Sequence, residues 1–487
     1  MGDLWIDFNN KAAYTDYYRE LDLNEATARV SYVQDGVTYK IQTPWNGNYH
    51  TDVNVEMNHW PAEVTNLSEC HLPLFDLIAS LVDLGTRTAR IQYNKKGWVV
   101  HPITNVWGYT SPGEYASWGM HTVLQYKEVN EALLRTPNSG GSQLLGLADF
   151  PGQGSAFVGI LDAFWDSKGL VSPEKYRESC APTVLLARMP KRAYVAGETF
   201  RAKMEIYHYG QYPLKRGKLK WELKDEQGTA ITSGSISTPA VPCATLDSLG
   251  VITIPLQDIT KAQKLTLHTT LDGKYHNEWD IWAYPEVQET ASGDFVYART
   301  YNAEVKQALA QGKNVLLVPE QLKGRKTKFA SHFWNSIMLN WDPMIVGTLI
   351  DSDHPAFSNF PTDSYADWQW WDILNYAAAM ELDELRNVTP VIQTVDAYEH
   401  NHKLGIAFEA RVDKGSLFVL NVDIDKDAAT RPAMRQLLYS VRKYVASDAF
   451  RPAVSIQPYQ LDALFDNTVK QDKGTSENAA VKQLLNQ

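Results

Sequence analysis

The spacing of apolar residues changes several times along the chain. In residues 3–40 apolar and polar side chains alternate, and this period of two predicts β-strands and a hairpin with an Asp-Gly turn. From Asp52 the period becomes helical, and a broad apolar face over residues 67–84 predicts a helix that ends at Gly85. Neither stretch has enough elements to enclose a core alone, so each needs a further packed layer.

A different pattern begins near residue 121. Val129–Leu134 predicts a short helix, and Gln143–Ala148 predicts a short strand that runs into a Gly/Pro-rich loop bearing Asp149. A strand that ends in such a loop resembles the carboxyl end of a strand in an α/β barrel, where those folds place their sites. The alternative is a tight turn that Asp149 caps.

Two further regions have regular patterns. Residues 183–290 hold short strands separated by turn residues, which predicts an immunoglobulin-like antiparallel β-sandwich. After residue 290 a strand, a helix and a strand follow one another, which predicts a three-layer α/β domain ending in an amphipathic helix at Thr430–Val445. No Gly-rich phosphate loop follows the first strand there, so a bound nucleotide is not indicated.

Composition narrows the function classes. The chain of 487 residues is too long for one compact core, and its net charge of −11 disfavours nucleic acid or an anionic membrane as partner. No apolar run is long enough for a membrane span, and the first residues show no signal peptide, which predicts either a cytoplasmic protein or a missing true beginning. The 3 cysteines lie far apart, so we expect no disulfide framework, no metal site and no cofactor.

The stretch from Tyr49 to His71 has the side chains that a sugar site needs. It brings Asp52, Asn54, Asn58 and Trp60 together in a short run. Carboxylate and amide groups hydrogen-bond sugar hydroxyls, and an indole covers the apolar face of the ring. The alternative is an ordinary polar helix start, with Asp52 or Asn54 as its N-cap.

An aromatic segment lies in a long insertion of the last domain. Trp368, Trp370 and Trp371 stand almost side by side in it. Such a cluster suits a platform on which a sugar stacks. Packing against another domain is the alternative interpretation.

The amino-terminal motifs resemble one known family. DLWIDFNN and PWNGNYHTDVNVEMNHWPAEVTNLSECHLPLFDLI, followed by GWVVHPITNVWG, resemble glycoside hydrolase family 95, the inverting α-L-fucosidases, over residues 3–120. The resemblance implies water positioning by Asp52 and Asn54, where the family has two asparagines, so one amide has become an acid. It also implies sugar contacts by Asn58, Trp60, His101 and Trp107. The family's general acid and base lie beyond the point where the resemblance stops.

Residues 124–455 resemble a second family instead. YKEVNEALLRTP, GSQLLGLADFPGQGSAFVGILDAFWDSKG and FPTDSYADWQWWDIL are similar to the carboxyl-terminal part of family 2 glycoside hydrolases, β-galactosidase-like proteins of Bacteroidetes. The two resemblances together imply a multidomain α+β protein. Its predicted segments are a β-sandwich fragment at 1–40, a fragment of an (α/α)6 barrel at 41–120, the end of a (β/α)8 barrel at 121–182, the immunoglobulin-like sandwich at 183–290, the α/β domain at 291–455 and a carboxyl-terminal tail at 456–487.

Two hypotheses on function follow. The first is a glycoside hydrolase of the α-L-fucosidase type, exo-acting and inverting. The second is a non-catalytic glycan-binding or fusion remnant that keeps sugar contacts at Trp60, Trp107 and the Trp368–Trp371 segment. Either one implies an oligosaccharide or glycan as the partner. The family resemblance suggests a periplasmic or extracellular protein, although no signal peptide is visible.

Overall fold

The computed structural model describes most of the chain. The described residues are 14–22, 27–34, 37–42, 49–50, 59, 62, 68–93, 96–100, 103–104, 118–137, 139, 141, 143–144, 146–149, 159–162, 164–286, 293–329, 345–396 and 402–465. Packing divides the chain into two compact units. The first consists of residues 1–115, 145–168 and 333–335, and the second of residues 116–144, 169–332 and 336–487.

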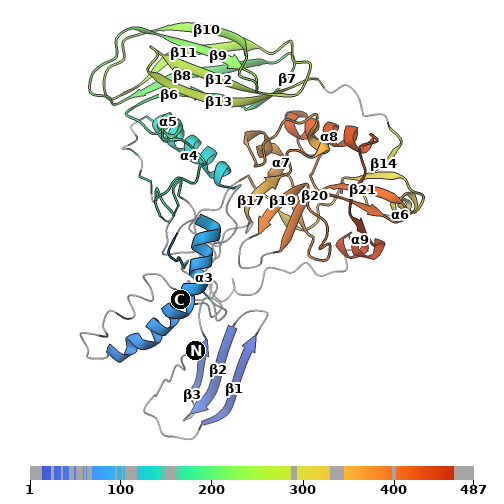
Figure 1. Ribbon diagram of the computed structural model, residues 1–487. Helices are drawn as coiled ribbons and strands as arrows, with labels where there is room; N and C mark the ends of the chain where they lie inside the picture. Colours follow the sequence, from blue (N-terminus) through green and yellow to red (C-terminus); the bar gives the residue numbers. More distant parts are fainter. Residues whose placement is uncertain are drawn as a thin grey trace. The chain divides into compact units, whose positions relative to one another are not determined.

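The first unit contains an antiparallel meander and one long helix (Figure 1). The period-two pattern forms three strands in the order β1-β2-β3, as the alternation predicts. A separate two-stranded ribbon joins β4 to β5. The elements are β1 (Tyr14–Asp22), β2 (Thr27–Gln34), β3 (Val37–Gln42), β4 (Tyr49–His50), the 3-10 helix η2 (Ser68–His71), α3 (Leu72–Tyr93) and β5 (Ile103–Thr104).

The sequence pattern predicts that this helix ends at Gly85. The helix α3 instead continues to Tyr93. Gly85 serves a close approach instead of a cap. The backbone N–H of Val99 donates to the Gly85 carbonyl at 3.2 Å, and a Cβ on Gly85 would lie 2.9 Å from the Val99 oxygen. A side chain at this position would therefore push the returning chain away from the helix.

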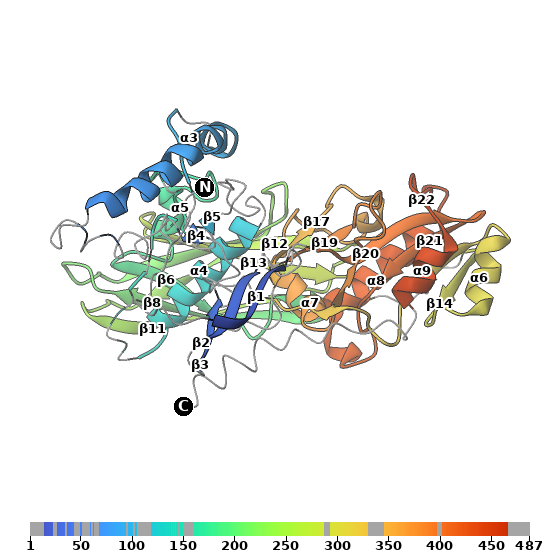
Figure 2. The ribbon, with the colours of Figure 1, turned by 90° about the horizontal axis from the view of Figure 1, so that it is seen from below.

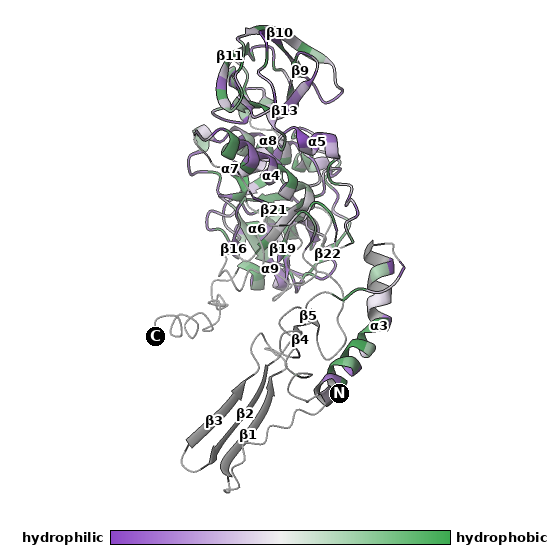
Figure 3. Cartoon of the chain, turned by 90° about the vertical axis from the view of Figure 1, so that its left-hand side faces the viewer, coloured by the Kyte–Doolittle hydropathy of each residue, from purple (hydrophilic) through white to green (hydrophobic). Residues whose placement is uncertain are grey.

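One end of α3 leaves apolar side chains in solvent. Leu72, Phe75 and Ile78 are exposed to 61%, 56% and 38%, whereas Leu81 and Ala89 are buried. Figure 3 shows the apolar colouring along this helix. The described part of the first unit thus buries only a portion of its apolar helix face.

The second unit begins with α4 (Trp118–Leu134). The predicted helix Val129–Leu134 is only the carboxyl-terminal part of α4. Buried polar groups tie α4 to the strand β13 and to the segment before η4. His121 Nδ1 donates to the Ala366 carbonyl at 2.7 Å, and Glu131 accepts from Asn277 and Trp279 at 3.0 and 2.8 Å. The helix therefore belongs to the packed structure of this unit.

A pair of sheets forms the first domain of this unit. The orders β10-β9-β12-β13-β7 and β11-β8-β6 enclose one core, to which both sheets contribute. The six strands that the pattern predicts here, from Thr183–Leu186 to Lys264–Leu271, are found as β6, β8, β9, β10, β11 and β12; β13 follows them, and the short β7 is additional. Its elements are α5 (Pro173–Arg177), β6 (Thr183–Arg188), β7 (Ala193–Val195), β8 (Thr199–His208), β9 (Gly217–Lys224), β10 (Ala230–Thr238), β11 (Thr245–Pro255), β12 (Gln263–Leu271) and β13 (Tyr275–Tyr284).

The last domain is a mixed sheet covered on both faces (Figures 1 and 2). Leu316 packs with residues of α8, whereas its neighbours Val315 and Leu317 pack with residues of α6 and α9. Its main elements are β14 (Phe295–Ala298), α6 (Ala303–Ala310), β15 (Asn314–Leu317), β16 (Arg325–Lys326), β17 (Ile345–Ile350), η3 (Pro355–Phe357), η4 (Trp368–Trp370), α7 (Trp371–Leu374), β18 (Ala378–Glu381), β19 (Ile392–Asp396), β20 (Lys403–Val412), β21 (Gly415–Leu420), η5 (Ala428–Thr430), α8 (Pro432–Val445), β22 (Ser455–Ile456) and α9 (Pro458–Phe465).

Two local predictions differ from this structure. The predicted strand Gln143–Ala148 does not form among its described residues, where Ala148 makes only a single bridge to Leu161. Ordered packing also extends beyond residue 455, because Leu461 of α9 is fully buried in the core of the α/β domain. The multidomain α+β organisation itself agrees with the sequence pattern.

Candidate functional site

Six predicted sugar-site residues lie outside the described residues: Asp52, Asn54, Asn58, Trp60, His101 and Trp107. The structure does describe the ribbon beside them. Tyr49 and His50 pair with Thr104 and Ile103 in antiparallel register. The two stretches of sequence that carry the predicted residues are therefore joined at this ribbon, although 50 or so positions separate them along the chain.

A row of stacked rings lies at the start of α3. The rings of His59 and His71 are 5.4 Å apart and stacked, and those of His71 and Phe75 follow at 5.8 Å. His59 Nδ1 is buried, and it makes no hydrogen bond with the residues that the structure describes. The end of the sugar-site motif is thus anchored to the helix by ring packing.

Asp149 is a buried carboxylate with only one oxygen engaged. Its side chain is 3% exposed, and Oδ1 accepts from Lys168 Nζ at 2.6 Å and from the Gly159 N–H at 3.0 Å. Oδ2 is also buried and has no hydrogen-bond partner within the described parts of the chain. Gly159 is required there, because a Cβ would lie 2.2 Å from the backbone of Ala148.

Burial is the main cause of the pKa shifts of Asp149 and Lys168. It raises the pKa of Asp149 to about 6, and the charge and hydrogen bond of Lys168 only partly oppose the rise. Burial likewise lowers the pKa of Lys168, against the attraction of Asp149. A carboxyl group that titrates near neutral pH is suited to proton transfer or to a switch between hydrogen-bond acceptor and donor. Neither interpretation of Asp149 drawn from the sequence included the lysine.

The three tryptophans of the aromatic segment have different surroundings. Trp370 is fully buried in the core of the α/β domain and donates from Nε1 to Thr362 Oγ1 at 2.9 Å, so its ring cannot meet a dissolved sugar. Trp368 is half-buried and packs with Arg192 and Phe329. Trp371 is 54% exposed and is therefore the member of the group with an accessible ring.

The described residues contain no group of three or more His, Cys, Asp or Glu side chains that could hold a metal ion. Nor is any helix among them long and apolar enough to cross a membrane.

Family models of glycosyl hydrolases match the part of the chain that contains the sugar-site motif. Residues 36–126 match the model of the glycosyl hydrolase family 95 catalytic domain, and residues 1–53 match that of the glycosyl hydrolase family 65 N-terminal domain. Two domains of unknown function match the later chain, DUF8488 at residues 198–285 and DUF8487 at residues 296–466. The amino-terminal quarter is therefore similar to glycoside hydrolases.

Individual relatives agree with this class. The chain is 42% identical over 84 residues to alpha-L-fucosidase 2 of Arabidopsis thaliana, and 37% identical over 76 residues to probable alpha-fucosidase A of Aspergillus niger. These matches cover 16% and 15% of this chain, and the chain spans only 10% of the length of each of these relatives. Among solved structures, a CARDB domain from Pyrococcus furiosus is similar over 21% of this chain and 94% of its own, with 8% identity and a TM-score of 0.17.

Proposed function

We propose that this chain is a glycan-binding protein of glycoside hydrolase descent, which recognises terminal α-L-fucosyl residues and has no complete hydrolytic pair of its own. The observation that carries the proposal is the match of residues 36–126 to a family 95 catalytic domain, together with the 42% identity to an α-L-fucosidase. The matched residues 36–126 contain the predicted sugar-site residues from Asp52 to Trp107.

The proposed contacts follow from the chemistry of these side chains. Asp52, Asn54 and Asn58 would hydrogen-bond sugar hydroxyls, while Trp60 and Trp107 would cover the apolar face of the ring. We place His101 in the same pocket. The pairing of β4 with β5, which lie next to the two halves of the motif along the chain, supports a single site for both halves.

Carboxylate geometry favours binding over hydrolysis. Inverting hydrolysis needs two carboxyl groups about 6.5–9.5 Å apart on opposite sides of the scissile bond. If their segment is helical, Asp52 and Glu56 lie one turn apart on the same face and cannot flank a sugar. Asp149 is the other candidate acid, but Lys168 pairs with it and its side chain is buried, which supports a structural role.

Hydrolysis of terminal fucose is the second candidate function. It is favoured because the matching model is that of a catalytic domain. In that case Asp52 and Asn54 would position the attacking water.

Turnover and binding assays separate the two candidates. We expect a fucosylated oligosaccharide to bind in calorimetry, and p-nitrophenyl α-L-fucoside and p-nitrophenyl β-D-galactoside to show no enzymatic release. Asp52→Ala should abolish binding, whereas Asp83→Ala, which removes an exposed acid of α3, should not. Release of nitrophenol from the fucoside that Asp52→Ala abolishes would establish the hydrolase. If fucosylated and unfucosylated oligosaccharides bind equally or not at all, both candidates fail.

The finer assignments belong to the same proposal. We propose that residues 1–40 and 41–120 derive from a β-sandwich and an (α/α)6 barrel, and that residues 124–455 derive from the carboxyl-terminal part of a family 2 glycoside hydrolase. The two packed sheets of residues 183–290 support an immunoglobulin-like sandwich. The exposed ring of Trp371 is a second proposed sugar contact, with Trp368 packed beside it at 6.5 Å.

A further inference from the structure

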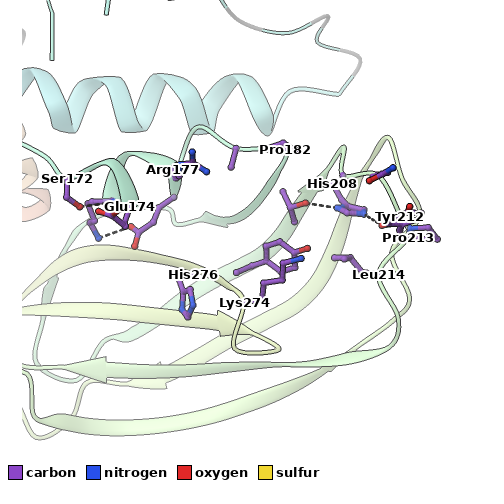
Figure 4. A pocket seen from close by; sticks show the side chains of 17 residues that line it. Ser172, Glu174, Arg177, Pro182, His208, Tyr212, Pro213, Leu214, Lys274 and His276 are labelled. Carbon is purple, nitrogen blue, oxygen red and sulfur yellow. Dashed lines mark hydrogen bonds and ion pairs between the residues drawn. The ribbon is translucent and has the colours of Figure 1, made fainter. Parts of the chain in front are cut away.

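A cleft of about 790 Å³ opens in the second unit between α5 and the ends of the sandwich strands (Figure 4). Its walls come from three places: α5 with the chain that follows it, the loop after β8, and the turn between β12 and β13. The volume lies within the range of small-molecule and cofactor pockets. Every residue of the site proposed above for fucose lies elsewhere in the sequence.

Two of the walls are held rigidly. Asp272 and Gly273 have φ values of 53° and 68°, and the Lys274 N–H donates to the Leu271 carbonyl at 3.0 Å, which defines a tight hairpin turn with left-handed central residues. This turn sets the positions of Lys274 and Tyr275 at the cleft. His208 holds the loop after β8, because its Nε2 donates to the Tyr212 carbonyl at 2.9 Å.

The third wall is tied to the sandwich by charged and polar contacts. Lys175 of α5 pairs with Glu178 at 2.7 Å and also with Glu278 of β13. The Asn277 amide donates to the Glu178 carbonyl at 3.2 Å. The charge of Lys175 is therefore already balanced by two carboxylates of this wall.

Two cations on the cleft remain available. Arg177 and Lys274 are exposed, and neither makes an ion pair with a carboxylate among the described residues, although Glu174 is close enough for its charge to act on Arg177. The ammonium group of Lys274 lies 5.0 Å from the centre of the Tyr275 ring. Tyr212 lines the cleft as well, and its side chain is 71% exposed. The cleft thus combines an excess of positive charge with an open aromatic face.

We propose that this cleft binds an acidic oligosaccharide, with a uronate or sialate carboxylate on Arg177 and Lys274 and a sugar face on Tyr212. A guanidinium group matches a carboxylate with two parallel hydrogen bonds, and a phenol ring covers sugar C–H groups. His276 is also exposed on the cleft, and because its Nδ1 shares a hydrogen bond with Thr270 Oγ1 at 3.0 Å, its Nε2 would be the atom to bond a sugar hydroxyl. The inference rests on the proposed function only for the class of ligand, a glycan.

The test uses the full chain and matched sugars. Calorimetry would measure binding of oligosaccharides that carry galacturonate, glucuronate or sialate, each beside its methyl ester, which keeps the ring and hydroxyls but removes the charge. We expect micromolar to millimolar binding of at least one acid, about tenfold or more weaker binding of its ester, and weakening by salt. Arg177→Gln should reduce affinity by about tenfold or more, because it removes the charge-assisted hydrogen bonds.

Arg201→Gln is the matched control, since Arg201 is an exposed arginine of β8 that does not line the cleft. Equal binding of acid and ester, equal effects of Arg177→Gln and Arg201→Gln, or no binding of any acid would each overturn the proposal. Circular dichroism of each variant separates lost binding from lost folding. Fucose binding, read with Asp52→Ala, fails or survives independently of these results.

Discussion

Two buried carboxylates show how differently the two units treat a charge. Glu131 in the second unit is fully buried, and both of its oxygens are engaged. Asp149 in the first unit is buried to nearly the same degree, yet one oxygen has no partner within the described residues. The partners of Glu131 are Lys127 at 2.7 Å, Arg135 at 3.5 Å, Asn277 at 3.0 Å and Trp279 at 2.8 Å.

The two units also differ in how they bury apolar side chains. The described core residues of the second unit fill three clusters, whereas α3 in the first unit exposes Leu72, Phe75 and Ile78. Unmatched polar groups and exposed apolar surface are costly, and they are common at binding sites and interfaces. Both units retain such features among their described residues, and in the first unit they include Asp149 Oδ2 and the exposed apolar end of α3.

The largest expected effect tests the second unit. Glu131→Ala should lower the free energy of unfolding by about 4 kcal/mol, because it leaves Lys127 and Arg135 without their buried counter-charge and the Trp279 N–H without its acceptor. Denaturant titration would measure the loss. Glu222→Ala, at an exposed pair with Lys224, is the control and should cost less than about 1 kcal/mol. A small effect of Glu131→Ala would break the contrast between the units.

A counter-ion test follows in the first unit. Lys168→Met should lower the free energy of unfolding by about 3 kcal/mol at pH 7, since the buried Asp149 then has no cation to balance its charge and must instead take up a proton from solution. At pH 5 the loss should shrink, because Asp149 is then mostly protonated. Lys96→Met, at an exposed lysine of the same unit, should change little at either pH. A loss that does not depend on pH would mean that packing, not charge, explains the effect.

Substitution of Asp149, the partner of Lys168, should change how the free energy of unfolding depends on pH. The pKa of Asp149 is about 6 in the folded chain against an ordinary 3.8, so the unfolded chain releases its proton first as the pH rises. The stability contributed by this group is therefore present below about pH 4 and lost between about pH 4 and 6. Asp149→Asn should remove that slope, and at pH 7 it also takes the counter-charge from the buried Lys168, which opposes any gain in stability.

The pH profile of the free energy of unfolding measures this effect, with Asp83→Asn on the exposed face of α3 as control. An unchanged slope in Asp149→Asn would show that another group titrates in this window. Asp372 is the first alternative, because burial raises its pKa to about 6 as well.

The smallest expected effect concerns the exposed face of α3. Phe75→Ser should change the free energy of unfolding by less than about 0.5 kcal/mol, because the ring is already in solvent, but it should reduce binding of a hydrophobic dye. Leu81→Ala, on the buried side of the same helix, should cost about 2–5 kcal/mol. A large loss in Phe75→Ser would reveal that this ring is covered in solution.

The regular elements could be predicted where burial is one-sided. The strand β8 alternates exposed and buried residues from Thr199 to Met204, and the pattern predicts a strand at Thr199–Tyr209, one residue longer than the observed one. The strand β18 was missed, because its first three residues are all buried and the run AAME has no alternation. Most of α4 was missed too, since its polar residues His121 and Glu131 face the interior and blur the helical period.

The candidate sites also differ in how well the sequence predicts them. Residue types alone indicated sugar chemistry near Asp52, and the family comparison agrees with it over residues 36–126. The aromatic segment could not be resolved from sequence, because three similar tryptophans have one buried, one half-buried and one exposed ring. The sequence does not predict the cleft beside α5, because its walls come from separate segments. Its one local feature is the Asp272-Gly273 turn between β12 and β13.

The sequence by itself determined the strands of the sandwich, the amphipathic helix at the end of the α/β domain and the presence of a glycosidase-like motif, because each depends on residues that are close along the chain. Only the tertiary structure decided that Glu131 meets Asn277, 146 positions away, and that Asp149 meets Lys168 while its second oxygen has no partner in the described parts of the chain. Such pairings depend on which surfaces come together in folding. Local periodicity carries no record of that choice.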